Sequence, residues 1–151
     1  MKSKLHFVAL LVFLFYAGQV SKAQEISYPE NRDFTEFKLY IQGIEDIEGE
    51  IRIAVFNSKE KYTKEPIHAI VLPADSSTII WKQEMLPSGE YAIAVYHDKN
   101  ENGKIDTNLL GIPKENYGFS NNARGRFGPA SWEDSMFIVD GNNFSTSIII
   151  K

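Results

Sequence analysis

The chain has 151 residues, of which 43% are hydrophobic and 24% charged, and its 16 basic and 20 acidic side chains give a net charge of -4. This is the composition of one globular domain with a packed core, which excludes a collagen-like or disordered chain. The acidic balance argues against a nucleic-acid partner, and the absence of cysteine excludes disulfides, thiolate metal sites and a cysteine nucleophile.

The N-terminal segment 1–23 has the pattern of a signal peptide. Lys2 and Lys4 precede an apolar run over 5–16, and small residues occupy the two positions that a signal peptidase reads. The run is too short to cross about 30 Å of hydrocarbon, so no membrane span is expected. The sequence therefore predicts export, to the periplasm or the extracellular medium, with 24–33 as a flexible mature N-terminus.

The remaining segment, 34–151, is predicted to be one all-β domain. Period-two or continuous β-rich runs recur between Gly, Pro, Asn and Asp residues, and no segment has an apolar period of 3.6. Phe37, Leu39 and Ile41 alternate with polar residues, as expected of a strand buried on one face. We expect an antiparallel β-sandwich, immunoglobulin-like or transthyretin-like, with a small barrel as the alternative. The sandwich should have about seven strands, at 34–42, 49–57, 67–72, 78–83, 91–97, 135–139 and 144–150.

One long segment, 98–133, does not follow the strand pattern. It contains too many apolar residues for a solvated tail, including Leu109, Leu110 and Ile112. Loops beyond about 15 residues are uncommon in compact domains unless they are functional or disordered. The sequence therefore predicts one long ordered loop.

A run rich in side-chain oxygens opens this loop. Oxygen-bearing side chains stand at alternate positions before Gly103, which permits a sharp turn. This is the spacing of calcium loops of the D-x-[DN]-x-[DN]-G type, in which hard oxygens surround the cation. The alternative is a turn whose side chains only cap its own backbone. The predicted Ca²⁺ ligands are Asp98, Asn100, Asn102, the carbonyl of Lys104, and Asp106.

The run departs from an EF-hand at its twelfth position, where Leu109 replaces the bidentate glutamate. The flanking helices of an EF-hand are also missing from the pattern. A carboxylate from elsewhere is expected to complete the site, with Asp134, Glu133 and Glu115 as candidates. Two carboxylates and two amides predict weak calcium binding, with a Kd on the order of 0.1 to 1 mM.

Three blocks of the sequence resemble a known family. The run from Tyr91 to Asn108, the run 111–122 and the run from Arg126 to Ala130 resemble, in this order, an exported bacterial family numbered 2141 among the domains of unknown function. The resemblance extends from about Phe37 to Ile150. It implies a small secreted or periplasmic all-β protein of a Gram-negative bacterium, without an established activity.

His97 is the only histidine in this unusual region. On a regular strand it shares a face with Ile93 and Val95, so we expect it at the rim of the core with its imidazole on a loop carbonyl. One histidine among several oxygens favours calcium over a transition metal. The alternative function is a hydrolase that uses His97 with Asp98 or Asp106, although neighbouring strand residues point to opposite faces, unlike a catalytic triad. No catalytic residue is assigned.

The segment 111–132 combines aromatic rings with amide and guanidinium groups, a composition that stacks on sugar rings or binds a carboxylate. The alternative is that these rings cap the open end of the core. The predicted function is an exported, non-enzymatic, calcium-stabilised module that binds a glycan, a peptide or a cell-envelope partner through this segment. The candidate ligand-binding residues are His97, Tyr117, Phe119, Asn121, Arg124, Arg126 and Trp132.

Overall fold

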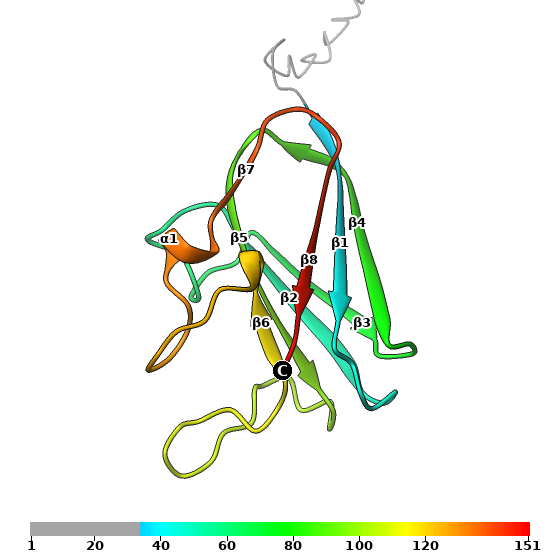
Figure 1. Cartoon of the computed structure of the whole chain (residues 1–151), viewed down its shortest axis with the longest axis vertical. Coiled ribbons are helices and arrows are strands. Elements are labelled where there is room, and N and C mark those ends of the chain that lie inside the picture. Colours follow the sequence, from blue (N-terminus) through cyan, green and yellow to red (C-terminus); the bar gives the residue numbers. More distant parts are fainter. Residues whose placement is uncertain (1–33) are drawn as a thin grey trace, which may run out of the picture. The chain divides into compact units, whose positions relative to one another are not determined.

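The computed structural model describes residues 34–151 and places them in two β-sheets (Figure 1). The predicted signal peptide, 1–23, and the predicted flexible segment, 24–33, lie outside the described residues. The elements in chain order are β1 (Phe34–Gln42), β2 (Glu50–Phe56), β3 (His68–Pro73), β4 (Thr78–Pro87), β5 (Gly89–Asp98), β6 (Tyr117–Phe119), the 3-10 helix η1 (Ser120–Asn122), α1 (Trp132–Ser135), β7 (Phe137–Val139) and β8 (Phe144–Ile149).

The two sheets pack as a sandwich, which confirms the predicted all-β fold. One sheet has the strand order β4-β1-β8, and the other has the order β3-β2-β5-β6, with β7 also paired to β5. All pairs are antiparallel except β1 with β8, which is parallel. This exception arises because the chain crosses from β7 in one sheet to β8 in the other, and no hairpin then dictates an antiparallel direction.

The core between the sheets is formed by the inward side of alternating strands. Phe37, Leu39 and Ile41 of β1 are fully buried, as their alternation predicts. The Phe37 ring stacks on the rings of Phe137 and Phe144, with centroid separations of 5.8 and 5.9 Å. Burial of large apolar side chains of this kind, each contributing roughly 1.5–3 kcal/mol, stabilises the fold without disulfides.

The expectation of a single long loop after β5 is wrong, because that segment contains β6, an eighth strand. A three-residue strand is too short to show an alternating pattern, and its central residue is glycine. A Cβ on Gly118 would lie 2.6 Å from Cγ2 of Ile148, so close packing against β8 leaves no room for a side chain. The N–H of Lys151 donates to the Tyr117 carbonyl at 3.2 Å, which fastens β6 to the chain end. The segment is therefore two loops.

A second, smaller core lies on the other face of the β2-β5-β6 region. Phe56 and Phe119 belong to it, whereas their strand neighbours Val55 and Gly118 face the main core or β8. Trp132 of α1 covers this face and is only 8% exposed, and its ring meets that of Tyr62 at 5.7 Å. The predicted strand 135–139 is shortened by α1, which supplies this cover. The other members of the second core are Ala92 and Ala130.

A buried chain of hydroxyl groups holds this cover in place. The Tyr62 hydroxyl donates to Oγ of Ser135 at 3.0 Å. The Ser120 hydroxyl donates to the Ser135 carbonyl at 2.5 Å and accepts the Ile93 N–H at 2.9 Å. Because Ser120 and Ser135 are fully buried, each of these bonds replaces one that water supplies in the unfolded chain.

Replacing Tyr62 with phenylalanine is expected to lower the free energy of unfolding by about 1 kcal/mol, because the buried Oγ of Ser135 loses the hydrogen bond that the Tyr62 hydroxyl donates. Urea denaturation measures this loss. Tyr40→Phe is the matched control, since the Tyr40 hydroxyl makes no hydrogen bond within the described residues. An equal effect of the two substitutions would contradict a structural role for the hydroxyl chain.

Candidate functional site

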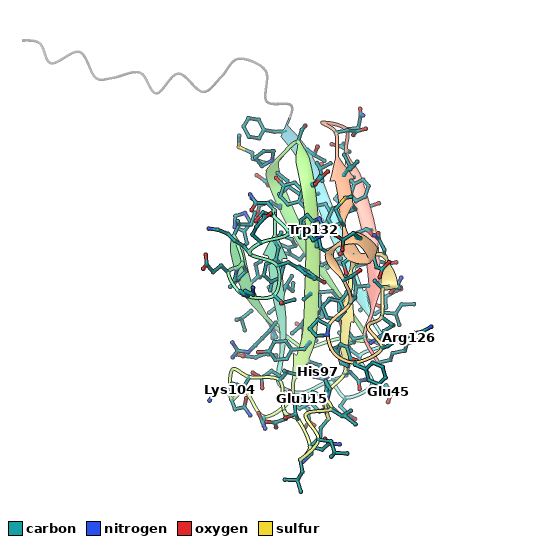
Figure 2. The ribbon with its side chains drawn as sticks, turned by 90° about the vertical axis from the view of Figure 1, so that its left-hand side faces the viewer. Glu45, His97, Lys104, Glu115, Arg126 and Trp132 are labelled. Atoms are coloured by element: carbon teal, nitrogen blue, oxygen red, sulfur yellow. The ribbon has the colours of Figure 1, made fainter. Side chains whose placement is uncertain are left out.

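The oxygen-rich run lies in the loop between β5 and β6, at one end of the sandwich. Figure 2 shows His97 and Glu115 near this end, with Lys104 and Glu45 on its two sides. The turn between β1 and β2 packs against the start of the loop, since a Cβ on Gly49 would lie 2.4 Å from the Asp98 carbonyl oxygen. The loop is therefore held against the sheet rather than free.

Asp98 is the buried anchor of the loop. Its carboxylate is fully buried and accepts the N–H of Gly103 at 2.8 Å and the N–H of Asn102 at 3.1 Å. It also accepts Nε of Arg52 at 2.6 Å. Burial by itself raises the pKa of Asp98, but the bonds from Gly103, Arg52 and Asn102 together hold that pKa below its ordinary value. The carboxylate is therefore ionised and satisfied within the fold.

Arg52 is a site residue that the sequence reasoning missed. It lies on β2, whose register places Glu50 directly opposite Asp98. The guanidinium donates Nε to Asp98 and Nη2 to Oε2 of Glu50, at 2.6 and 2.8 Å. The outward position of Arg52 was visible in the alternation of β2, but its partner depends on the pairing of two strands far apart in the sequence.

The next positions of the run turn their side-chain oxygens back to the loop backbone. Oδ1 of Asn100 accepts the Asn102 N–H at 3.2 Å, and Oδ1 of Asn102 accepts the Lys104 N–H at 2.8 Å. The amide groups of Asn100 and Asn102 donate to the two oxygens of Asp106 at 2.8 and 3.1 Å. Gly103, at φ +80°, supplies the left-handed turn between Asn102 and Asp106. The structure therefore brings Asn100 and Asn102 to Asp106, whereas the Asp98 carboxylate bonds to Arg52 and the loop backbone.

Glu115 closes the loop from its far end. Only 8% of its surface is exposed, and its carboxylate accepts the N–H of Lys99 at 3.1 Å and the N–H of Asp106 at 2.9 Å. Of the three candidates for an additional carboxylate, Glu115 is the one beside the loop. Glu133 pairs with Lys59, and Asp134 accepts from Ser131 at the start of α1.

The loop offers hard oxygen donors of two kinds, carboxylates and amides. Over residues 34–151 no group of three or more histidine, aspartate or glutamate side chains is placed to hold a metal. Calcium also accepts amide and backbone carbonyl oxygens, which are the groups that this loop adds to its carboxylates. In the structure the amide nitrogens of Asn100 and Asn102 face Asp106, and their oxygens accept loop N–H groups.

His97 lies at the core rim with its imidazole on a loop carbonyl, as predicted. It is fully buried, its ring Nε2 donates to the Glu48 carbonyl at 2.7 Å, and its backbone N–H donates to the Asn116 carbonyl at 2.9 Å. Its side chain belongs to the inner face of β5, whereas Asp98 bonds to Arg52 on the outer face. This arrangement does not orient the imidazole toward the carboxylate as a hydrolytic triad requires.

The predicted ligand-binding residues fall into three groups. Phe119 and Trp132 are buried in the second core, and His97 is buried at the rim of the main core. These three rings therefore do not form a surface for a ligand. Asn121 donates to the carbonyls of two residues around α1, and Arg124 donates to those of Tyr117 and Ile149. Tyr117 and Arg126 form the last group. Their side chains are accessible to solvent and are not bonded to backbone carbonyls within the described residues.

Arg124 also lies over the Tyr117 ring, with its guanidinium carbon 5.0 Å from the ring centroid. The guanidinium covers one face of the Tyr117 ring, and the ring as a whole is half-buried. This contact fixes the orientation of Tyr117 at the start of β6.

The apolar residues at the far point of the loop are exposed, although the apolar content of the segment predicted an ordered loop rather than a solvated tail. Leu109 and Leu110 are 105% and 83% exposed, and Ile112 is 55% exposed. The loop is ordered by Asp98 and Glu115 instead of by these side chains. Their positions therefore require a different explanation from packing.

The fold and this loop define a β-sandwich protein with an asparagine- and aspartate-rich loop that a buried glutamate closes. The chain belongs to the family DUF2141, described as an uncharacterized protein conserved in bacteria, whose pattern matches residues 39–147. Neither the curated proteins nor the solved structures contain a match to the chain. Within the described residues, no helix has the length and apolar character needed to cross a membrane.

Proposed function

We propose that this chain is an exported, non-enzymatic binding module. Its 98–116 loop holds Ca²⁺, and the end of the sandwich that carries this loop and the 111–132 segment binds a glycan, a peptide or another cell-envelope partner. The observation that carries the proposal is the convergence of Asn100 and Asn102 on the Asp106 carboxylate, within a loop that is already closed by a buried glutamate.

The chemistry of the donors supports calcium as the cation. Oxygen ligands without thiolates favour calcium or magnesium, and the flexible geometry of calcium tolerates amides and a carbonyl better than the strict octahedron of magnesium does. Arg52 already neutralises Asp98, which weakens the attraction of the site for a cation. The groups that would hold the ion are Asp98, Asn100, Asn102, the Lys104 carbonyl and Asp106, with Glu115 beside them.

Calcium at about 5 mM is expected to raise the melting temperature of the protein by about 3–6 °C relative to chelator, since a Kd of about 0.5 mM at this concentration corresponds to about 1.4 kcal/mol. Scanning calorimetry in calcium, magnesium and chelator measures the shift. Asp106→Ala should abolish it, because this substitution removes the carboxylate on which both amides converge.

Asp140→Ala is the matched control for this experiment. Asp140 also accepts the N–H of the residue two positions later, at 3.3 Å, but it lies in the turn between β7 and β8. Its replacement should leave the calcium shift unchanged. Equal melting temperatures of the parent protein in calcium and chelator would contradict the metal part of the proposal.

Partner binding at this end draws support from the residues that remain accessible there. Tyr117 offers a half-buried ring, and Arg126 is exposed on the segment before α1. The histidine that a hydrolase would use is fully buried, and its Nε2 bonds to the Glu48 carbonyl. A binding role thus accounts for more of the arrangement than a hydrolase does.

A further inference from the structure

The far point of the loop is a built apolar tip, formed by Leu109, Leu110 and Ile112. In Figure 1 the loop after β5 projects beyond the ends of the strands. Both leucines occupy the middle of a tight turn, and they are 105% and 83% exposed. Adjacent leucines with this exposure are costly in water, and exposed apolar groups of this kind mark interaction sites.

The turn is held in one conformation by Asn108. Its N–H donates to the Ile112 carbonyl at 2.9 Å, its carbonyl accepts the Gly111 N–H at 2.9 Å, and its side-chain oxygen accepts the N–H groups of Leu110 and Ile112 at 2.9 and 3.0 Å. A bridge between Thr107 and Pro113 closes the neck of the turn. The leucines are therefore presented outward by the backbone rather than left exposed by a loose loop.

The charges around the apolar tip fit an anionic lipid surface. The seven residues from Thr107 to Pro113 carry no charge. On one side they follow Lys104 and Asp106, whose carboxylate accepts the amide groups of Asn100 and Asn102, and on the other side they precede Lys114. Both lysines are exposed, and neither forms an ion pair within the described part of the chain. Apolar side chains at a projecting point with free cations behind them match the depth profile of a bilayer surface, in which phosphates lie outside hydrocarbon.

We propose that the apolar tip inserts into the surface of a lipid bilayer and that Lys104 and Lys114 contact its phosphates, so that the protein binds a membrane peripherally. This rests on the proposed function in one respect, namely that this end of the sandwich faces the envelope. A second copy of the chain is a poorer occupant, because a stable symmetric contact needs about 800 Å² from each partner and a projecting turn does not supply a flat self-complementary surface.

The test uses the protein with residues 1–23 removed and large unilamellar vesicles of phosphatidylethanolamine and phosphatidylglycerol at 3:1. Flotation should recover the parent protein with the vesicles, and Leu109→Ser combined with Leu110→Ser should weaken partition at least ~10-fold. Replacing Lys104 and Lys114 with glutamine should weaken partition several-fold on these vesicles and leave the weaker partition on phosphatidylcholine vesicles unchanged.

The matched control combines Met85→Ser with Ile138→Ser. Each of these side chains is 60% exposed. Met85 lies on β4 next to Leu86, which pairs with Thr35 of β1, and Ile138 lies on β7 opposite Glu90 at the start of β5, so both are away from the loop. The control should float like the parent. Calorimetry should give all variants the parent melting temperature within 2 °C or so, because the replaced side chains lie outside the core.

Three results would overturn the proposal: no flotation of the parent, equal flotation of the leucine variant, or equal loss in the control. A parent that fails to float but forms a dimer that the leucine variant does not form would assign the apolar tip to a second copy instead. Flotation is measured in calcium and in chelator. A protein that melts higher in calcium but does not float contradicts only the lipid proposal, whereas flotation without a calcium shift contradicts only the metal site.

Discussion

Replacing Arg52 with alanine is expected to lower the free energy of unfolding several times more than removal of an exposed ion pair, because it leaves the Asp98 carboxylate buried without its cation. Asp98 is fully buried, and the guanidinium that pairs with it also binds Glu50, so one substitution disrupts both contacts. Urea denaturation measures the change. Asp98→Asn with and without Arg52→Ala completes a double-mutant cycle that isolates the interaction of the pair.

Lys38→Ala is the control for removal of an ion pair from a strand. Lys38 pairs with Glu36 on β1 at 2.8 Å, but both side chains are at least a third exposed, so we expect little or no loss of stability. Arg52→Ala should also lose less in 5 mM calcium than in chelator, because Asp98 is then free to bind the cation. A loss no larger than that of the control would refute the anchoring role of this pair.

The same pair predicts how stability depends on pH. The pKa of Asp98 is lower in the folded protein than in the unfolded chain, against the effect of burial, because of its bonds from Gly103, Arg52 and Asn102. Its contribution is therefore fully present above the unfolded pKa of about 3.9 and is lost as the pH falls through the folded pKa. The difference in unfolding free energy between the parent and Asp98→Asn should shrink over this acidic window.

Replacing Glu115 with alanine is expected to lower the free energy of unfolding by about 2 kcal/mol and to open the 98–116 loop. The substitution leaves the N–H groups of Lys99 and Asp106 without acceptors in a partly buried site. Hydrogen exchange measured by mass spectrometry or NMR should become faster at these two amides and within the loop between them.

Glu115→Gln provides a graded comparison for the same position. Its amide oxygen replaces one of the two acceptors, so we expect about half of the loss in stability and faster exchange at one of the two amides. Glu101→Ala is the control within the loop, since Glu101 is exposed. If exchange at Lys99 and Asp106 does not change in the alanine variant, the loop is closed by other contacts.

The sequence by itself determined the features that depend on neighbours along the chain. The alternation of Phe37, Leu39 and Ile41 predicts a strand with one buried face, and these side chains are buried. The spacing of Asp98, Asn100 and Gly103 predicts a calcium loop, with a turn capped by its own side chains as the alternative, and the hydrogen bonds of the observed turn span two to five residues. Such features are readable because backbone geometry fixes the distance between residues close in sequence.

Only the tertiary structure decided which distant groups meet. Arg52 reaches Asp98 across 46 residues because β2 pairs with β5 in one particular register, and a shift by one residue would turn Arg52 to the opposite face. Trp132 was expected at a binding surface but covers a second core, since a sheet with two apolar faces needs cover on both. The apolar residues of the segment predicted an ordered loop, but the loop leaves the leucines of the apolar tip exposed. Composition counts apolar side chains, whereas the path of the chain decides which of them find a partner.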